Sequence, residues 1–353
     1  MELNNKNIGR RNFFKLIGGI FGVSALSYYF GLSSKENVPS VNEPSNYADG
    51  GIGLPVFRGP YFQKDVGLVA LLYRADVNIL TALCDQTLNV VPSSPYRYVP
   101  LTSTLLLIYA DMLVASLDER DAQVGFIPET EVGFWILTVA MQKTSNGEVP
   151  HHLAWFIPAL YVNESNSIIT GREVYGFNKQ AGEINKPKEI YSPNFSADVF
   201  GFKQFAPDAI AQKQRLFEVS ASSEEQSQSV WSDWRSAREY FTDTITGSVR
   251  SDMGSSLIGF AAQALVDHIP LVFLKQIRSA AHVEKASYQK VIEAPLKMKE
   301  FYAGATLTQS YSLRLVHLES HPLAKRLGLQ PEQTNLLGTW LKVDFVLELG
   351  TEY

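Results

Sequence analysis

The residue with the clearest chemical potential in this chain is a lysine among aromatic and small residues. Lys179 is the only lysine in the stretch 168–184, and Tyr175 and Phe177 closely precede it. An amine in apolar surroundings can form an imine with a carbonyl compound, because desolvation disfavours the ammonium and frees the lone pair. Most lysines are instead solvated surface charges. Lys179 is therefore a candidate whose role depends on the elements that position it.

The composition indicates a globular, β-rich protein. Of the 353 residues, 45% are hydrophobic and 19% are charged, as is typical of folded chains. The 16 Tyr and 20 Phe, together with many short apolar runs, favour strands. The formal net charge is −5 and the only basic cluster lies near the N-terminus, so nucleic acid is not an expected partner. Cys84 is the single cysteine, which excludes an internal disulfide and a thiolate zinc site, and no metal is expected.

Residues 1–32 form a predicted signal or anchor segment. Arg10 and Arg11 precede an apolar run at 16–31, a pattern typical of export signals, and the arginine pair resembles a twin-arginine signal. The apolar run is shorter than the roughly 20 residues of a spanning helix, but a retained anchor and a chance apolar terminus stay open. We expect export to the periplasm by the twin-arginine machinery, or tethering to the membrane. Residues 33–51 have the composition of a linker.

Residues 52–353 are predicted to form one mainly β (α+β) domain. Apolar runs predict strands at 67–74, 103–110, 132–141, 153–162, 270–275, 288–293 and 306–316. Residues 77–83 have helical spacing, and 164–167 are expected to be a loop. Two stretches with helical spacing predict a helical insertion at about 222–267, and a lid or an oligomer contact are open roles for it.

The stretch around Lys179 resembles a segment of the acetoacetate decarboxylase family. Gly171-Arg172-Glu173, followed by an aromatic residue and Lys179, is similar to the family's Gly-Arg-Glu…Pro-Lys-Lys pattern. Upstream, Arg58-Gly-Pro-Tyr61 and Tyr73-Arg74-Ala75-Asp76 look like two further family landmarks. Thr130-Glu-Val-Gly133 is similar to the segment that carries a family active-site glutamate.

This resemblance, over about 52–219 and 270–327, implies a fold and a reaction. The implied fold is an antiparallel closed β-barrel around a central cavity, with the insertion outside the resemblance. The implied reaction is decarboxylation of a small β-keto acid through an imine on Lys179, without a cofactor, while Glu131 orients the substrate or moves protons. Substrate contacts are expected from Arg74, Asp111 and Phe177.

The sequence departs from the family pattern at three positions. Gln180 replaces a second lysine, Asn178 replaces a proline, and Val66 replaces an arginine. The reactive lysine must be neutral, so without the second cation burial is expected to lower the pKa of Lys179. Acetoacetate itself is a poor expectation for the substrate. Two alternatives stay open: an imine-forming condensation or dehydration enzyme, and a non-catalytic barrel that binds a carbonyl or apolar ligand. A homo-oligomer is compatible with the sequence.

Overall fold

The computed structural model describes residues 46–48, 51, 54–221, 230–233, 235–236 and 269–353. The predicted signal or anchor segment (1–32), most of the linker (33–51) and most of the helical insertion (222–267) lie outside the described residues. In the part of the chain that is described, no helix has both the length and the apolar character needed to cross a bilayer.

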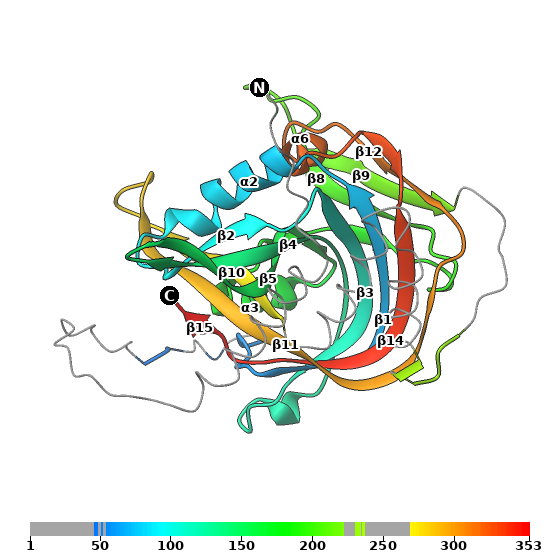
Figure 1. Cartoon of the computed structure of the whole chain (residues 1–353), viewed down its shortest axis with the longest axis horizontal. Helices are drawn as coiled ribbons and strands as arrows, with labels where there is room; N and C mark the ends of the chain where they lie inside the picture. Colours follow the sequence, from blue (N-terminus) through cyan, green and yellow to red (C-terminus); the bar gives the residue numbers. More distant parts are fainter. Residues whose placement is uncertain (1–45, 49–50, 52–53, 222–229, 234, 237–268) are drawn as a thin grey trace, which may run out of the picture.

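Two β-sheets make up most of the described chain (Figure 1). The larger contains β1 (Tyr61–Arg74), β2 (Tyr96–Pro100), β3 (Thr104–Ser116), β4 (Ile127–Thr144), β5 (Gly147–Val162), β6 (Lys179–Ala181), β10 (Pro270–Arg278), β11 (Ala286–Thr306), β14 (Leu337–Leu347) and β15 (Thr351–Glu352). The smaller contains β7 (Glu183–Asn185), β8 (Phe195–Gly201), β9 (Gln212–Ala221), β12 (Tyr311–Leu315) and β13 (Glu332–Thr334). The helices are α2 (Val77–Gln86), α3 (Ser165–Val174), α6 (Leu323–Leu327) and the 3-10 turns η1 (Leu88–Val90) and η2 (Ala122–Val124).

The large sheet follows the order β2-β4-β3-β1-β14-β11-β10-β5-β6, and β4 also pairs with β5. The path of paired strands therefore leads from β4 through β3, β1, β14, β11 and β10 back to β5 and β4. The expectation of a purely antiparallel sheet is wrong, because β5 runs parallel to both β10 and β6. The expectation of a mainly β chain is confirmed.

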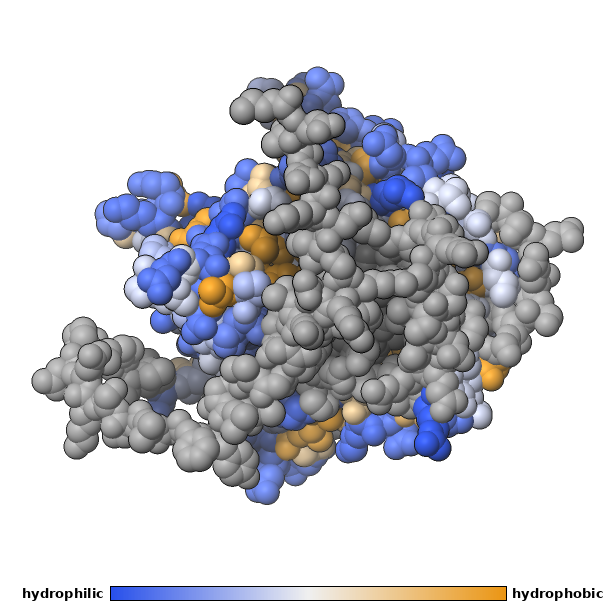
Figure 2. All heavy atoms as spheres, viewed as in Figure 1, coloured by the Kyte–Doolittle hydropathy of each residue, from blue (hydrophilic) through white to orange (hydrophobic). Residues whose placement is uncertain are grey.

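Most strands of the large sheet are buried on both faces. The inner face, which surrounds α3 in Figure 1, carries one hydrophobic cluster that includes Leu68, Ile108 and Phe345. The outer face packs against the small sheet and α2 through a second cluster that includes Leu71, Leu107 and Phe217. Burial on both faces explains why these strands are continuous apolar runs rather than alternating patterns. Polar residues predominate around the rim of the described surface in Figure 2.

The predicted strands agree with the structure except near the last one. The run at 306–316 is divided between the end of β11 and β12, with residues 307–310 outside both strands. The expected loop at 164–167 is also incorrect, since α3 begins at Ser165. This second difference matters most, because α3 carries part of the candidate site.

Candidate active site

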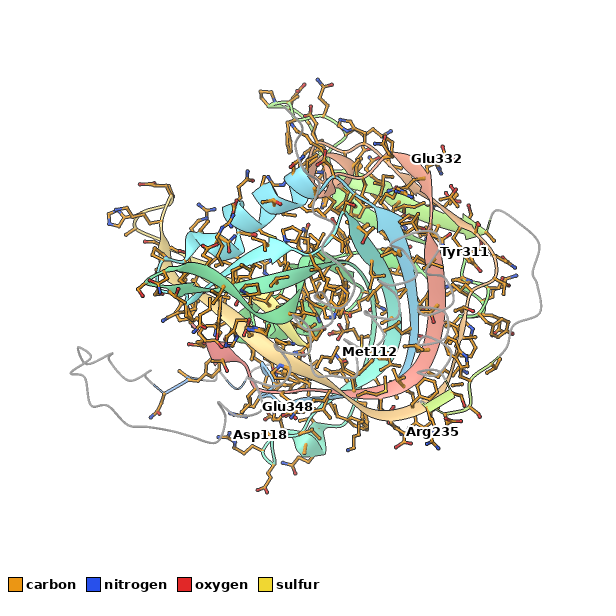
Figure 3. All side chains as sticks on the ribbon, viewed as in Figure 1. Met112, Asp118, Arg235, Tyr311, Glu332 and Glu348 are labelled. Carbon is orange, nitrogen blue, oxygen red and sulfur yellow. The ribbon has the colours of Figure 1, made fainter. Side chains whose placement is uncertain are left out.

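A largely apolar cavity lies on the inner face of the large sheet. Met112, labelled in Figure 3, projects into this interior from β3. The side chains around the cavity come mainly from β1, β3, β4, α3 and the segment that leads into β6. They are Phe57, Tyr61, Gln63, Val66, Leu68, Ile108, Ala110, Met112, Val114, Ile127, Glu129, Glu131, Trp135, Asn166, Ser167, Thr170, Gly171, Tyr175, Phe177, Lys179, Leu271, Leu296, Phe345 and Leu347.

Strand β4 brings two carboxylates to the same face. Glu129 and Glu131 are two residues apart, so their side chains leave the strand on one side. In the register with β3, Glu129 lies opposite Met112 and Glu131 lies opposite Ala110, and both of those residues line the cavity. The alternation of side chains along β3 and β4 therefore places both glutamates beside apolar residues in the cavity wall.

An irregularity in β1 keeps its inward residues on the cavity side. Tyr61 and Gln63 line the cavity before the irregularity, and Val66 and Leu68 line it afterwards. Strict alternation would turn the second pair outward, but the register with β3 and β14 shifts between residues 63 and 67. The shift is a bulge at Asp65, which has a positive φ of 54°. The extra residue reverses the alternation and returns β1 to the cavity.

Helix α3 supplies the space that Lys179 occupies. Its N-terminus is capped by Glu164, whose side chain accepts from the backbone N–H of Ser167. Its C-terminus turns at Gly176, which has φ +82° and would place a Cβ against the backbone of Lys275. Within the helix, a Cβ at Gly171 would lie 2.9 Å from Cδ of Lys179. Gly171 therefore lets the lysine side chain pass directly over the helix.

The neighbouring arginine holds the lysine backbone. Arg172 donates from Nη1 to the carbonyl oxygen of Lys179 at 3.1 Å. Glu173 is exposed. Within the Gly-Arg-Glu motif, Gly171 therefore leaves room for the Lys179 side chain, and Arg172 holds the backbone of β6 by a hydrogen bond.

The amine of Lys179 is buried and surrounded by oxygen atoms. The residue is 7% exposed. Its Nζ donates to Oε1 of Glu129 at 2.7 Å and to Oγ of Ser167 at 2.6 Å, and it lies 3.8 Å from Oε2 of Glu131. The ring of Phe177 lies beneath it, with 5.2 Å between Nζ and the ring centroid. Lys179, Glu129 and Glu131 thus form one closely coupled group.

The charges in this group oppose the expected neutral lysine. Burial by itself lowers the pKa of Lys179, but Glu129 and Glu131 more than offset it and hold the pKa above its ordinary value. Burial tends to raise the pKa of Glu129, but the charge and hydrogen bond of Lys179 bring it below its ordinary value. Burial raises the pKa of Glu131 to about 8; the charge of Lys179 acts against this shift, whereas the charge of Glu129 and a hydrogen bond with it act in the same direction. At neutral pH the group is an ammonium, a carboxylate and a carboxylic acid.

The structure brings together three of the five site residues expected from the sequence. Lys179, Glu131 and Phe177 all line the cavity. Arg74 does not, because it lies exposed at the end of β1. Asp111 also lies elsewhere: it alternates with the inward-facing Ala110 and Met112 and accepts hydrogen bonds from Thr130 and Lys186. Neither residue is assigned a role at the cavity.

The three departures from the family pattern have different surroundings. Val66 is 2% exposed and lines the cavity, so that wall is apolar. Gln180 follows Lys179 in β6 and its side chain contacts His321, away from the cavity lining, with 3.1 Å between Oε1 and Nε2. Asn178 donates to the carbonyl oxygen of Pro158.

Both hydrogen-bond partners of the Lys179 amine, Glu129 and Ser167, were missed by sequence reasoning. Glu129 precedes Glu131 by two residues, and a strand with this spacing places both on one face, so the signal was available. Ser167 had no comparable signal, because the segment that contains it has the composition of a loop.

We expect Gly171→Ala to reduce imine formation by about tenfold to a hundredfold while the protein stays folded. The added Cβ lies within 2.9–3.1 Å of Cδ and Cε of Lys179, so the flexible side chain must move away from its partners. Alanine also favours the helix by about 1 kcal/mol relative to glycine. The rate of borohydride trapping and the midpoint of thermal unfolding measure the two effects. Unchanged trapping would show that the position of the lysine side chain tolerates this displacement.

Comparison with solved structures identifies the fold. An acetoacetate decarboxylase from Legionella pneumophila matches with a TM-score of 0.53 and 14% identity, over 89% of this chain and 98% of that one. Another acetoacetate decarboxylase matches with a TM-score of 0.50 and 15% identity, over 85% and 91%. The enduracididine biosynthesis enzyme MppR, complexed with the condensation product of pyruvate and imidazole 4-carboxaldehyde, matches with a TM-score of 0.51 and 12% identity, over 88% and 98%.

No protein family described by a sequence profile matches the chain, and no curated protein matches it. At 12–15% identity the structural matches establish the fold alone. The chain has the acetoacetate decarboxylase-like fold, which is shared by decarboxylases and by MppR.

Proposed function

We propose that this protein is an enzyme that forms an imine between Lys179 and a carbonyl substrate, and that it decarboxylates a β-keto acid. The observation that carries the proposal is the buried amine of Lys179, 2.7 Å from Glu129 and 3.8 Å from Glu131 in an apolar cavity. The similarity in fold to acetoacetate decarboxylases supports the same reaction class.

Glu129 accounts for how a charged lysine becomes a nucleophile. It accepts a proton from the Lys179 ammonium, and the freed amine attacks the substrate carbonyl. Glu129 then returns the proton to the departing hydroxyl, so that water leaves and an iminium forms. Substrate binding in the cavity favours this transfer, because it excludes water and weakens the stabilisation of the ion pair by solvent.

Glu131 supplies the later proton. As the bond to the carboxylate breaks, its electron pair moves to the iminium, which leaves CO2 and a neutral enamine. The Glu131 carboxylic acid protonates the enamine carbon, water hydrolyses the resulting iminium, and the ketone departs. Glu131 recovers its proton from solvent, so each turnover consumes one proton and releases one CO2. With its pKa raised to about 8, this carboxyl group is protonated at neutral pH.

A condensation or dehydration enzyme is the second candidate. The observation that favours it is that Glu129, as a base, and Glu131, as an acid, lie on one strand beside Lys179. Such a pair can also remove a proton from the carbon next to an imine and return it elsewhere. MppR, in complex with a condensation product, shows the same fold. A non-catalytic carbonyl-binding protein is the third reading.

Incubation with β-keto acids, followed by borohydride, separates these functions. Decarboxylation predicts CO2 release and a reduced covalent adduct. Condensation or dehydration predicts an adduct without CO2. Failure of every tested β-keto acid, ketone and aldehyde to give an adduct, with the protein folded, would contradict both enzymatic functions and favour the binding protein.

We also propose export through the twin-arginine pathway, on the basis of Arg10 and Arg11 before an apolar run. Replacing both arginines by lysine is expected to leave the precursor in the cytoplasm, while an Arg58→Lys variant is exported normally. Fractionation of a bacterial host with a functional pathway measures the distribution. Export of the Lys-Lys variant at the normal level would rule out twin-arginine recognition.

A further inference from the structure

The cavity wall offers very little charge to a substrate. Among the described residues that line it, Lys179 is the only cation, and its charge is already matched by Glu129. Most of the remaining lining is aliphatic or aromatic. A second ionised group on the substrate would meet no counter-charge here, and burying an unpaired charge is strongly unfavourable.

Most polar groups in the wall are already used within the protein. The hydroxyls of Tyr61 and Tyr175 donate to the carbonyl oxygens of Phe57 and Glu348, and the Asn166 amide donates to the carbonyl oxygen of Pro55. These groups support the wall and have little capacity left for a ligand.

Trp135 differs from these groups. It is 5% exposed and lines the cavity, but its indole Nε1–H has no hydrogen-bond acceptor in the described chain. Gln63 also lines the cavity, but it is only partly buried, so water can satisfy it. A buried donor without an acceptor is unfavourable, because it has lost its hydrogen bond to water and gained none. In a cavity wall, such a donor suggests that the acceptor belongs to the ligand.

The register places Trp135 on the face of β4 that carries Glu131, in the wall of the same cavity as Lys179. Trp135 leaves β4 on the same face as Glu131, with Gly133 between them, and its Nε1 lies 3.1 Å from where a Cβ of Gly133 would be. The missing side chain at Gly133 makes room for the indole. Gly133 pairs with Leu160, and Leu160 pairs with Lys179, so the three residues lie in one row across β4, β5 and β6.

We propose that Trp135 determines specificity by donating its indole N–H to the carboxylate of a β-keto acid whose remaining chain is apolar and uncharged. This rests on the proposed imine chemistry at Lys179. A neutral donor orients the carboxylate without neutralising it, so the charge stays poorly solvated until its electrons move to the iminium and CO2 leaves. No additional reactant is required.

The substrate class is tested with two β-keto acids of equal chain length. 3-Oxohexanoate ends in a methyl group, and 3-oxoadipate ends in a second carboxylate. We expect kcat/KM for CO2 release to be at least about a hundredfold higher for 3-oxohexanoate, since the second carboxylate is buried unpaired. Equal rates, or a preference for 3-oxoadipate, would overturn the inference and leave the proposed function intact. Absence of adducts with either acid and with 2-pentanone would overturn the proposed function itself.

The role of Trp135 is tested with a matched pair of variants. Trp155 packs edge-on against Trp135, with 6.0 Å between ring centroids, and its Nε1–H also lacks an acceptor in the described chain, but it does not line the cavity. We expect Trp135→Phe to raise KM for 3-oxohexanoate by about tenfold or more, as for a lost hydrogen bond to a charged group. Borohydride trapping of 2-pentanone, the ketone product without the carboxylate, is expected to change little. Trp155→Phe is expected to affect neither.

Equal losses of binding for the acid and the ketone in Trp135→Phe would show a packing role and overturn the assignment, as would an unchanged KM.

A measurement without substitution at Trp135 provides a second test. In a K179M/E129Q variant, which cannot turn the substrate over, 3-oxohexanoate is expected to shift one of the five indole N–H proton resonances downfield, whereas 2-pentanone is not. No acid-specific shift would also contradict the proposal.

Discussion

Replacement of Lys179 by methionine together with Glu129 by glutamine is expected to abolish borohydride trapping and to lower turnover by more than about 10⁴-fold. The methionine keeps the length and apolar character of the lysine side chain but removes the amine. The paired change avoids leaving the Glu129 carboxylate buried beside no cation. Turnover and trapping are measured with the same β-keto acid.

Two further variants separate chemistry from stability. Lys179→Met alone is expected to reduce the free energy of unfolding by about 3–5 kcal/mol, because Glu129 loses its partner in a buried ion pair. Addition of Glu129→Gln is expected to recover most of the lost free energy of unfolding, as measured by denaturant unfolding. Lys186→Met is the matched control, since Lys186 is paired with Asp111 and does not line the cavity. Trapping that persists in the double variant would place the imine on another lysine.

Glu131→Gln is expected to lower steady-state turnover by about 10²–10⁴-fold while borohydride trapping continues. Glutamine keeps the shape of the neutral carboxyl group but cannot protonate the enamine carbon. The variant should therefore release CO2 in a first turnover and then stall. Rapid-mixing measurement of CO2 release detects this pattern. Asp111→Asn makes the same type of change away from the cavity and is expected to leave turnover unchanged.

The pH dependence follows from the raised pKa of Glu131. The proposed reaction needs the protonated carboxyl group, so turnover is expected to fall as pH rises through about 8. The freed amine becomes more abundant in the same direction, since the pKa of Lys179 lies above its ordinary value. Trapping should therefore not decline with turnover. A decline of both over the same pH range, or the same turnover profile in Glu131→Gln, would contradict the assigned role of Glu131.

Much of the large sheet is predictable from the sequence, because its strands are buried on both faces and appear as long apolar runs. The position of α3 is harder to predict from the sequence. Its Ser165–Val174 sequence has little amphipathic pattern, and its boundaries depend on the cap at Glu164 and the turn at Gly176. The parallel pairing of β6 with β5 depends on that helix, because α3 is part of the connection that brings the chain back to begin β6 in the same direction as β5.

The candidate site likewise has residues that the sequence predicts and properties that only the tertiary structure sets. Lys179 and Glu131 are visible as a motif, and Glu129 follows once the strand alternation is applied. Asp111 shows what sequence resemblance misses, since a strand position one residue away faces the opposite side. Arg74 shows a second limit, because it lies exposed at the end of β1, beyond the cavity. The charge state of Lys179 depends on tertiary structure: burial favours a neutral amine, but the approach of two carboxylates reverses the direction of the pKa shift.

The central claim is that the Lys179 amine forms the covalent intermediate. It is tested most directly by borohydride reduction in the presence of 3-oxohexanoate, followed by mass analysis of the intact protein and its peptides. We predict a single reduced adduct per chain, located on Lys179, with no adduct when either borohydride or the β-keto acid is omitted. An unmodified Lys179 in a protein that still releases CO2 from the substrate would contradict the account.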